Sequence, residues 1–573
     1  MRATTLPRHK PLAYLPKRFQ LSNWNELLPY YQELSQRPIG SRQELEQWLL
    51  DRSELDAFVS EAFAWRYIKI TVDSADEEAS AAYQEVVQVF APRISEYENL
   101  LNRKLVDSPY VSQLEPTQYA IYLRGVRNAV ALFREENIEL GTQVQLLSKE
   151  HGKTFSEMTV GVNGAQMTLQ KAGTLLEEPN REYREEVYHT INRRILQDAD
   201  HLEDVFGQLL EKRHAIALNA GFDNFRDYRF RSLGRFDYSV QDCLNFHDSI
   251  AAEILPLLDQ LNEKRMEALS LDRLRPWDLH VDTHRDTPLR PFQNVDELLE
   301  KTIRCLNSLH PMFGEVLAIM RDMKRLDLDS RPGKRPGGYN MPLLQTGVPF
   351  IFMNATQSVG DMRTLMHESG HAIHAYLTRH LRLSASKKVP SEVAELAAMS
   401  MELLSMDHWH VFFDNEEDLR LAKLHQLETS LKVLPWIATI DKFQHWLYTH
   451  PQHAKAERRE AWMRIFYEFK SNLVDHDGLE NYAAHLWHKQ LHLFEVPFYY
   501  IEYGMAQLGA IAIWKQYRED PVATIERYMA ALRLGYTRPI GEIYATAGIS
   551  FDFSTAYIGE LGRFIKSEID KLA

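Results

Sequence analysis

The sequence predicts a mainly α-helical protein with at least two packed lobes. Apolar residues recur at helical spacing, with acidic residues between them, over most of the chain. Patterns typical of strands are few and short. The chain has 573 residues, of which 45% are hydrophobic. It is therefore longer than one growing core supports, and it has enough apolar side chains for more than one.

The predicted helices are long and amphipathic. Residues 43–63 (QELEQWLLDRSELDAFVSEAF) place Leu45, Trp48 and Leu55 at helical spacing, with acids between them. A second helical pattern, rich in Ala and Glu, follows over residues 77–105. The same periodicity predicts helices over residues 242–269, 295–323, 419–449 and 522–533.

Two regions carry strand patterns. Residues 158–160 and 166–169 flank Asn163 and Gly164, a dipeptide that favours a tight hairpin turn. Residues 348–354 (VPFIFMN) are apolar and aromatic, which predicts a short buried strand. The stretch before it, 329–341, is rich in Gly, Pro and basic residues, which predicts a loop.

The chain is expected to divide near residue 200. Between residues 190 and 235, an Arg-rich sequence containing Asn and Gly interrupts the helical patterns. Residues 1–200 are then an N-terminal helical lobe with the small hairpin. Residues 201–573 form the domain that carries the chemical motifs.

The composition argues against several classes of function. A formal net charge of -14 is unsuited to nucleic-acid binding, which requires clustered Lys and Arg. No run of about 18 apolar residues and no apolar secretory signal is present, so we expect no membrane association. The two cysteines, Cys243 and Cys305, are interpreted as reduced, buried thiols. These observations predict a cytoplasmic protein.

The sequence HESGH at residues 367–371 indicates the chemistry. In a helix, His367 and His371 lie one turn apart on one face, so both imidazoles reach one metal ion. Glu368 follows His367 by about 100° around the helix axis, which places its carboxylate beside the ion. That is the position of a general base in metal-assisted hydrolysis. Ser358 and Asp361 form a capping pattern that starts this helix.

A third ligand is expected from residues 391–404 (SEVAELAAMSMELL). Glu392, Glu395 and Glu402 lie along one side of this predicted helix, crowded by Ala, Leu and Met rather than by solvated side chains. One carboxylate completes a zinc site, while another hydrogen-bonds a histidine ligand. Spacing alone does not choose between Glu392 and Glu395. His374 shares the face of the two histidines and is interpreted as a packing or supporting residue.

These motifs resemble those of a known family. The chain is similar to the thimet oligopeptidase and oligoendopeptidase F family of zinc metallopeptidases. The similarity includes the HExGHxxH pattern from His367 to His374 and the seven-residue spacing of Glu395 and Glu402. Chain length, the hairpin and residues 276–282 (PWDLHVD) resemble the oligoendopeptidase F branch, so the resemblance covers nearly the whole chain.

The resemblance implies a fold and a metal site. The implied fold is a two-lobed helical ellipsoid with a deep central channel and a small β-sheet beside the zinc helix. Residues 201–573 become its catalytic zinc-peptidase domain. One Zn²⁺ per chain is implied, although the ligand types also suit cobalt or manganese. The implied ligands are His367, His371 and Glu395, supported by Glu402 and His374.

The resemblance also implies a reaction. The implied activity is hydrolysis of internal bonds of short, unfolded oligopeptides, with Glu368 as the general base. The family places a His and two Tyr three residues apart near the substrate, and His492, Tyr500 and Tyr503 match this pattern. We expect these side chains to hydrogen-bond the carbonyl oxygen as it gains charge. We expect the strand at 348–354 to pair with the substrate backbone.

Two alternatives remain open. A zinc carboxypeptidase or dipeptidase on a related helical scaffold would require a cation, such as Lys334 or Arg335, to anchor the C-terminal carboxylate of the substrate. A peptide-binding protein without catalysis is the other alternative, and the intact Glu368 argues against it. Short peptides are the expected partners in each case, and the sequence defines no oligomeric state.

Overall fold

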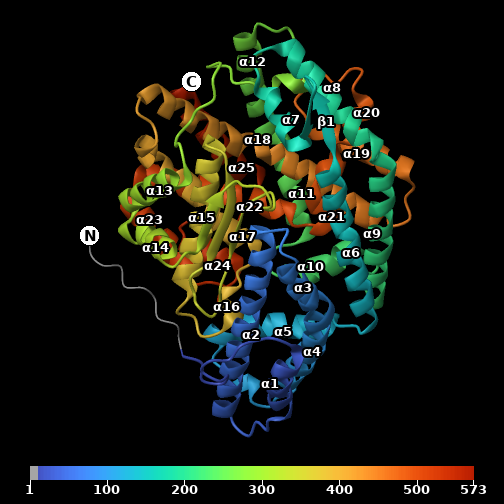
Figure 1. Ribbon diagram of the computed structural model, residues 1–573, viewed down its shortest axis with the longest axis vertical. Coiled ribbons are helices and arrows are strands. Elements are labelled where there is room, and N and C mark those ends of the chain that lie inside the picture. The colour runs from blue at the N-terminus through green and yellow to red at the C-terminus, as the bar shows by residue number, and fades with distance from the viewer. Residues whose placement is uncertain (1–10) are drawn as a thin grey trace. The chain divides into compact units, whose positions relative to one another are not determined.

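The computed structural model describes residues 11–573, and these residues form two compact units. Unit 1 comprises the described part of Met1–Leu132 together with Leu289–Lys423 and Met505–Phe551. Unit 2 comprises Phe133–Pro288, Leu424–Gly504 and Asp552–Ala573. The division expected near residue 200 stays a prediction. Helices dominate both units, so the predicted mainly α-helical fold is confirmed (Figure 1).

The first segment of unit 1 is entirely helical. Its helices are α1 (Trp24–Gln36), α2 (Arg42–Val72), α3 (Glu77–Glu85), α4 (Ala91–Val106) and α5 (Pro116–Leu132). The other two segments add α13 (Val295–Leu309), α14 (Pro311–Asp322), β3 (Leu326–Asp329), β4 (Tyr339–Met341), β5 (Phe350–Ala355), α15 (Val359–Thr378), α16 (Ser384–Lys387), α17 (Ser391–Ser405), α23 (Pro521–Arg533) and α24 (Ile540–Thr546).

Unit 2 combines helices with one hairpin. Its elements are α6 (Glu136–Glu157), β1 (Thr159–Val162), β2 (Ala165–Thr168), α7 (Leu169–Thr174), α8 (Arg181–Gln197), α9 (Ala199–Asn219), α10 (Phe225–Ser232), α11 (Val240–Ser249), α12 (Leu255–Leu269), α19 (Lys455–Phe469), α20 (Glu480–Ala483), α21 (Leu491–Glu495) and α25 (Thr555–Leu572). Two further helices, α18 (Glu416–Thr449) and α22 (Tyr500–Glu519), contribute residues to both units.

The helix predicted over residues 43–63 forms the middle of α2. Ser41 caps its N-terminus by accepting a hydrogen bond from the backbone N–H of Glu44. Leu45 and Trp48 are fully buried in the core of the N-terminal helices, and the indole N–H of Trp48 donates to the carbonyl of Leu34 at 2.9 Å. Local periodicity therefore places this helix and its buried face correctly.

The helix predicted over residues 295–323 is two helices, α13 and α14. Pro311 begins α14, and it has no backbone N–H to continue the hydrogen bonds of α13. His310 is extended at the junction, with φ -160°, and its imidazole accepts a hydrogen bond from the backbone N–H of Met312. Proline at the first turn of a helix is favourable, so the interruption is local in origin.

The predicted hairpin is confirmed in unit 2. Strands β1 and β2 are antiparallel, with Val162 paired to Ala165 across the two-residue turn. Asn163 and Gly164 both adopt positive φ, at 51° and 76°. This conformation matches the right-handed twist of the two strands.

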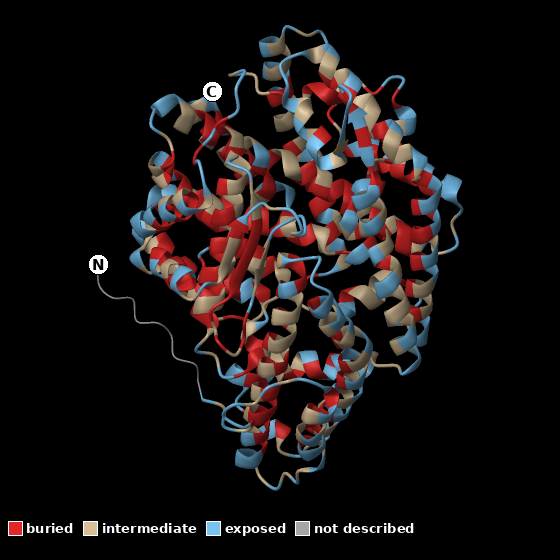
Figure 2. Cartoon of the chain, in the orientation of Figure 1, coloured by how far each residue is buried: buried red, intermediate tan, exposed pale blue. Residues whose placement is uncertain are grey.

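The predicted strand at 348–354 is β5, the central strand of a three-stranded sheet in the order β3-β5-β4. It runs parallel to β3 and antiparallel to β4, and its first four residues are buried (Figure 2). The stretch 329–341, predicted to be a loop, ends in the short strand β4. Because neighbours occupy both sides of β5, the expected pairing of β5 with substrate is wrong. The open edge belongs to β4.

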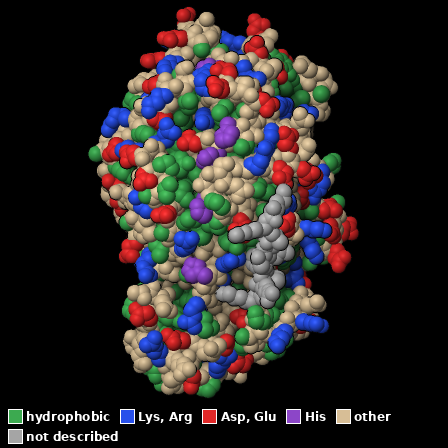
Figure 3. Space-filling view, turned by 90° about the vertical axis from the view of Figure 1, so that its left-hand side faces the viewer, with side chains coloured by type: hydrophobic (Ala, Val, Ile, Leu, Met, Phe, Trp, Pro, Cys, Tyr) green, Lys and Arg blue, Asp and Glu red, His purple; other side chains and the backbone are tan. Residues whose placement is uncertain are grey.

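The surface of the described residues carries charges of both signs. On the face drawn in Figure 3, Lys and Arg side chains are interspersed with Asp and Glu. This mixture gives that face no extended basic surface of the kind that follows a nucleic-acid backbone. Within residues 11–573, no helix combines the length and the apolar character required to cross a membrane.

Candidate metal centre

Helix α15 presents His367 and His371 in unit 1. The predicted capping box starts this helix: Ser358 Oγ lies 2.8 Å from Asp361 Oδ2, and the backbone N–H of Asp361 donates back to Ser358 Oγ at 3.1 Å. The two imidazoles lie one turn apart, with ring centroids separated by 4.9 Å. The local sequence therefore places both rings on one face of a well-anchored helix.

Helix α17 lies beside α15 and brings the acidic residues to these rings (Figure 1). The closest approach is at Gly370, inside the HESGH sequence. A Cβ added there would lie only 2.6 Å from the carbonyl oxygen of Ala397 and 2.6 Å from the Cα of Ala398. Only glycine fits this contact without moving one backbone. Gly370 therefore sets the distance between the helices that supply the candidate ligands.

The side chains of His367, His371 and Glu395 converge. Their ligand atoms all lie within 4.8 Å of one another. Glu395 Oε2 is 3.3 Å from His367 Nε2 and 3.9 Å from His371 Nε2. Two ligand atoms at about 2.05 Å from a tetrahedral zinc ion are roughly 3.3 Å apart, so the observed spacing fits a zinc ion. Among the described residues, Glu395 and not Glu392 joins the two histidines in this group.

The outer nitrogens of both histidines have partners on α17. His367 Nδ1 lies 2.8 Å from Glu402 Oε1, and His371 hydrogen-bonds the backbone of Ala394. These bonds direct the Nε2 atoms of the two rings toward Glu395. Hydrogen bonds of this kind orient histidine ligands and raise their basicity in metal sites.

Charge in the group favours a bound cation. Burial lowers the pKa of His367, but Glu395 and Glu402 more than offset this effect and hold that pKa well above its ordinary value. For His371, burial dominates and lowers the pKa to about 4. The two carboxylates thus act on one edge of the group, while the second imidazole stays neutral and able to coordinate.

The carboxyl group of Glu368 lies beside this group and is not part of it. The residue is buried, and within the described part of the chain its Oε2 has no hydrogen-bond partner. Burial raises its pKa to about 7. A carboxyl group with a pKa near neutral pH can both accept and return a proton.

His374 lies one turn beyond His371 and serves a different contact. Burial lowers its pKa to about 3, and it hydrogen-bonds the backbone of Leu532, next to the end of α23. It is not in the ligand group formed by His367, His371 and Glu395. Its contact connects α15 to α23, which agrees with the interpretation of His374 as a packing or supporting residue.

His492, Tyr500 and Tyr503 lie together in unit 2. The ring centroid of His492 is 4.9 Å from that of Tyr500 and 5.7 Å from that of Tyr503. Gln490, which the sequence did not single out, donates to His492 Nδ1 at 2.8 Å and accepts from the indole N–H of Trp436 at 2.9 Å. Burial raises the pKa of Tyr500 to about 12, so this hydroxyl stays protonated at neutral pH.

Lys334 is engaged and does not offer a free ammonium group. Its side chain is fully buried, and Nζ lies 2.9 Å from Asp327 Oδ1 and 2.7 Å from the carbonyl oxygen of Asp329. It also donates to the carbonyl of Met353 in β5. These bonds satisfy all three ammonium protons. Lys334 therefore stabilises the sheet beside α15, which removes it as an anchor for a substrate carboxylate.

Comparisons with known proteins agree with this architecture. The oligopeptidase PepF of Bacillus subtilis is 23% identical over 296 residues, covering 52% of this chain and 44% of the relative. The chromosomal oligoendopeptidase F of Lactococcus lactis subsp. cremoris is 22% identical over 422 residues, covering 71% and 66%. The aligned regions therefore span less than two thirds of either relative.

Similarity in three dimensions covers almost the whole chain. The solved structure of PZ peptidase A with an inhibitor superposes with a TM-score of 0.90 at 26% identity, covering 97% of this chain and 98% of that one. The family model for the peptidase M3 N-terminal domain matches residues 17–133, and the model for peptidase family M3 matches residues 174–563. The chain belongs to peptidase family M3.

Proposed function

We propose that this protein is a zinc-dependent endopeptidase that hydrolyses internal bonds of short, unfolded oligopeptides. One observation carries the proposal: the ligand atoms of His367, His371 and Glu395 lie within 4.8 Å of one another, with the buried carboxyl group of Glu368 beside them. Two neutral nitrogens and one carboxylate, with a position left open, are typical of hydrolytic zinc sites.

Each residue at the centre has a defined task in this proposal. A zinc ion, when bound, lowers the pKa of water and polarises a carbonyl group. Glu368 accepts a proton from the attacking water and delivers it to the amine that leaves. Glu402 and the backbone of Ala394 hold the two imidazoles in position. The carboxyl group of Glu368 suits the proton transfer because burial has already raised its pKa to about 7.

The open edge of β4 supplies a binding surface for an extended peptide. Asn340 of β4 donates through Nδ2 to the backbone carbonyl of Glu368 at 3.2 Å, which connects this strand to α15. A substrate that adds to the free edge would be recognised through its backbone, with little dependence on side chains. Only an unfolded segment can pair in this way, which supports oligopeptides as the substrates.

His492, Tyr500 and Tyr503 are proposed to donate hydrogen bonds to the carbonyl oxygen during hydrolysis. Their match to the family pattern supports this role. Their mutual packing in unit 2, with ring centroids 4.9–5.7 Å apart, supports it as well. The cytoplasmic location of the protein stays a prediction.

Treatment with a strong chelator is expected to abolish cleavage of a decapeptide, and added Zn²⁺ is expected to restore it, because the proposed chemistry requires the metal. Mass spectrometry of the products tests this. Cleavage should occur at internal bonds, and it should persist when the C-terminus of the peptide is amidated. A carboxypeptidase would require the free carboxylate, so loss of cleavage after amidation would favour that alternative. A full rate after chelation would rule out metal-dependent hydrolysis.

Replacing Glu395 by alanine is expected to remove tight metal binding, whereas Glu392→Ala should leave it intact. Only Glu395 contributes a carboxylate to the ligand group, although both residues are buried on α17. Metal-to-protein ratios measured after dialysis separate the two. Glu402→Gln gives an intermediate case, because loss of an outer hydrogen bond typically weakens metal binding about 10–100-fold. Full metal content in Glu395→Ala would overturn the ligand assignment.

A further inference from the structure

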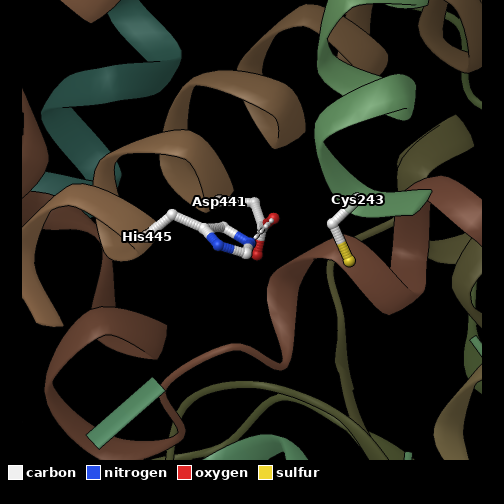
Figure 4. A group of neighbouring side chains, drawn as sticks. All are labelled: Cys243, Asp441 and His445. Carbon is white, nitrogen blue, oxygen red and sulfur yellow. Dashed lines mark ion pairs between the residues drawn. The ribbon is translucent and has the colours of Figure 1, made fainter. Parts of the chain in front are cut away.

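A second group of ligand-type side chains lies in unit 2, apart from the residues of the candidate metal centre in unit 1. Cys243, Asp441 and His445 each offer one ligand atom, and these three atoms lie within 4.8 Å of one another. Figure 4 shows the Asp441 carboxylate between the His445 ring and the Cys243 thiol. All three residues are buried, and Cys243 and Asp441 have 0% exposed surface. A mixed thiol, carboxylate and imidazole group is therefore enclosed in the protein.

Two helices supply these residues with the same spacing. Cys243 and His247 stand at positions i and i+4 of α11, and Asp441 and His445 stand at positions i and i+4 of α18. Residues at this spacing lie one turn apart on one face of a helix. Each helix therefore directs two ligand-type side chains toward the other, on rigid backbone.

The contacts inside the group leave ligand capacity unused. Asp441 Oδ2 lies 2.9 Å from His247 Nε2 and 3.2 Å from His445 Nε2. Within the described residues, the second oxygen of Asp441, Oδ1, is buried without a hydrogen-bond partner, and so are the Nδ1 atoms of both histidines. Native proteins rarely leave several polar atoms unsatisfied at one buried place, and an ion is one explanation for such a cluster.

The charges of the group favour a divalent cation. In the described chain, the ion pairs of Asp441 are with the two imidazoles, while the neighbouring Lys442 is paired with Glu468. Burial lowers the pKa of His247, which keeps its ring neutral and able to coordinate. An ionised Cys243 and an ionised Asp441 together carry two negative charges. One divalent ion neutralises both, whereas the same charges without a cation are costly to bury.

The surroundings are those of a structural site. The rings of Phe230 and Phe498 pack on His445, with centroid distances of 5.9 and 5.3 Å. Structural zinc sites are closed and four-coordinate, with ligands drawn from Cys, His and Asp. The nearby His247 is positioned to be the fourth ligand, since its Nε2 is already 2.9 Å from Asp441 Oδ2.

We propose that Cys243, His247, Asp441 and His445 form a second metal site, which takes zinc or another borderline divalent cation such as cobalt and stabilises the packing of α11 on α18. When the metal binds, the S–H bond of Cys243 breaks, a sulfur–metal bond forms, and the proton leaves to solvent. The thiolate disfavours magnesium and calcium, which prefer oxygen ligands. This proposal does not rest on the proposed peptidase function, because no residue is shared with the first centre.

Cobalt substitution tests the second site directly. The full-length protein is produced in medium supplied with Co²⁺, so that a buried site can fill during folding. We expect two metal ions per chain and the near-ultraviolet charge-transfer absorption of a cobalt–thiolate bond. The proposed ligands at the first centre, His367, His371 and Glu395, include no sulfur. The absorption therefore reports on the second site alone. X-ray absorption of the zinc form should show a metal–sulfur distance of about 2.3 Å.

Matched variants assign the signal. Cys243→Ser should lose the thiolate absorption and one metal ion per chain. Cys305→Ser is the control, because it changes the other buried cysteine, which is outside both ligand groups, and it should keep both. A His367→Ala and His371→Ala double variant should lose one metal ion and retain the absorption, which separates this proposal from the first centre.

The wild-type measurement decides the proposal even where Cys243→Ser does not fold. Wild-type and Cys305→Ser protein with at most one metal ion per chain and no thiolate absorption would overturn it. The group would then be a metal-free hydrogen-bond network in which Asp441 accepts from two imidazoles. Thiolate absorption that persists in Cys243→Ser would overturn it as well.

Discussion

Replacing Glu368 by glutamine is expected to lower kcat by about 10²–10⁴-fold, the usual contribution of a general base, while the metal content stays at the wild-type level. Glutamine keeps the shape of the side chain but cannot accept the proton of water. Glu368 is not part of the ligand group, so metal binding does not depend on its charge. Steady-state kinetics on a quenched-fluorescence peptide, together with metal analysis, measures both quantities.

The control for this substitution is Glu392→Gln. Glu392 is also a buried glutamate near the centre, on α17, but it is outside the ligand group. It should therefore keep kcat within a few-fold of wild type. Glu368→Gln with wild-type kcat would contradict the assignment of the base. Loss of metal from Glu368→Gln would instead mean that Glu368 is a ligand, which is a different error and is distinguishable from the first.

The stability of Glu368→Gln provides an independent reading. Burial raises the pKa of Glu368 to about 7, so the folded protein disfavours the charged form, and the neutral amide removes this cost. Its Oε2 has no hydrogen-bond partner in the described residues, so no bond to that atom is lost. We therefore expect a melting temperature equal to or above that of wild type. Lost activity with retained stability indicates a chemical role rather than a structural one.

The histidine pair of the candidate centre is predictable because its determinants are local. A capping box at Ser358 and Asp361 starts the helix, and the spacing of His367 and His371 follows from helix geometry. The carboxylate is different. Glu392 and Glu395 are both on the correct side of their predicted helix. Only the packing of α17 on α15 distinguishes them, and that packing involves residues far apart in the sequence.

Gly370 is the residue whose importance sequence reasoning missed. Glycine in the interior of a helix is unfavourable by about 0.5–1 kcal/mol relative to alanine, so its presence in a strong helical pattern was a usable signal. The structure shows the reason, since a Cβ at this position would overlap the backbone at Ala397 and Ala398. A pattern search for HExxH treats this position as variable, although it decides how close Glu395 comes to the two histidines.

The central position of β5 was also beyond the sequence. Its apolar residues correctly predicted a buried strand, but the order of strands in a sheet depends on pairing between distant segments. The neighbouring strand β4 is three residues long and follows a stretch rich in Gly and Pro, so local propensity predicted a loop. The open edge was therefore assigned to the wrong strand.

Replacing Tyr500 by phenylalanine is expected to lower kcat by about 10²–10³-fold with little change in KM, because the hydroxyl is proposed to meet charge that develops only in the transition state. Trp436 and Gln490 hydrogen-bond the Tyr500 side chain. An indole can only donate, so Trp436 donates to the phenol oxygen, and the hydroxyl proton of Tyr500 remains available to a substrate. Kinetics over a range of peptide concentrations measures kcat and KM separately.

The matched control is Tyr499→Phe, because Tyr499 packs in the same cluster, with its ring centroid 6.0 Å from His492 and 5.3 Å from Tyr503. It should leave kcat within a few-fold of wild type. An unchanged kcat in Tyr500→Phe would rule out the proposed contact with the carbonyl oxygen. Equal losses in both variants would indicate a packing role for the cluster, and thermal unfolding of both proteins would detect it. Only a selective loss of kcat, at unchanged stability, supports Tyr500 as a donor to the reacting oxygen.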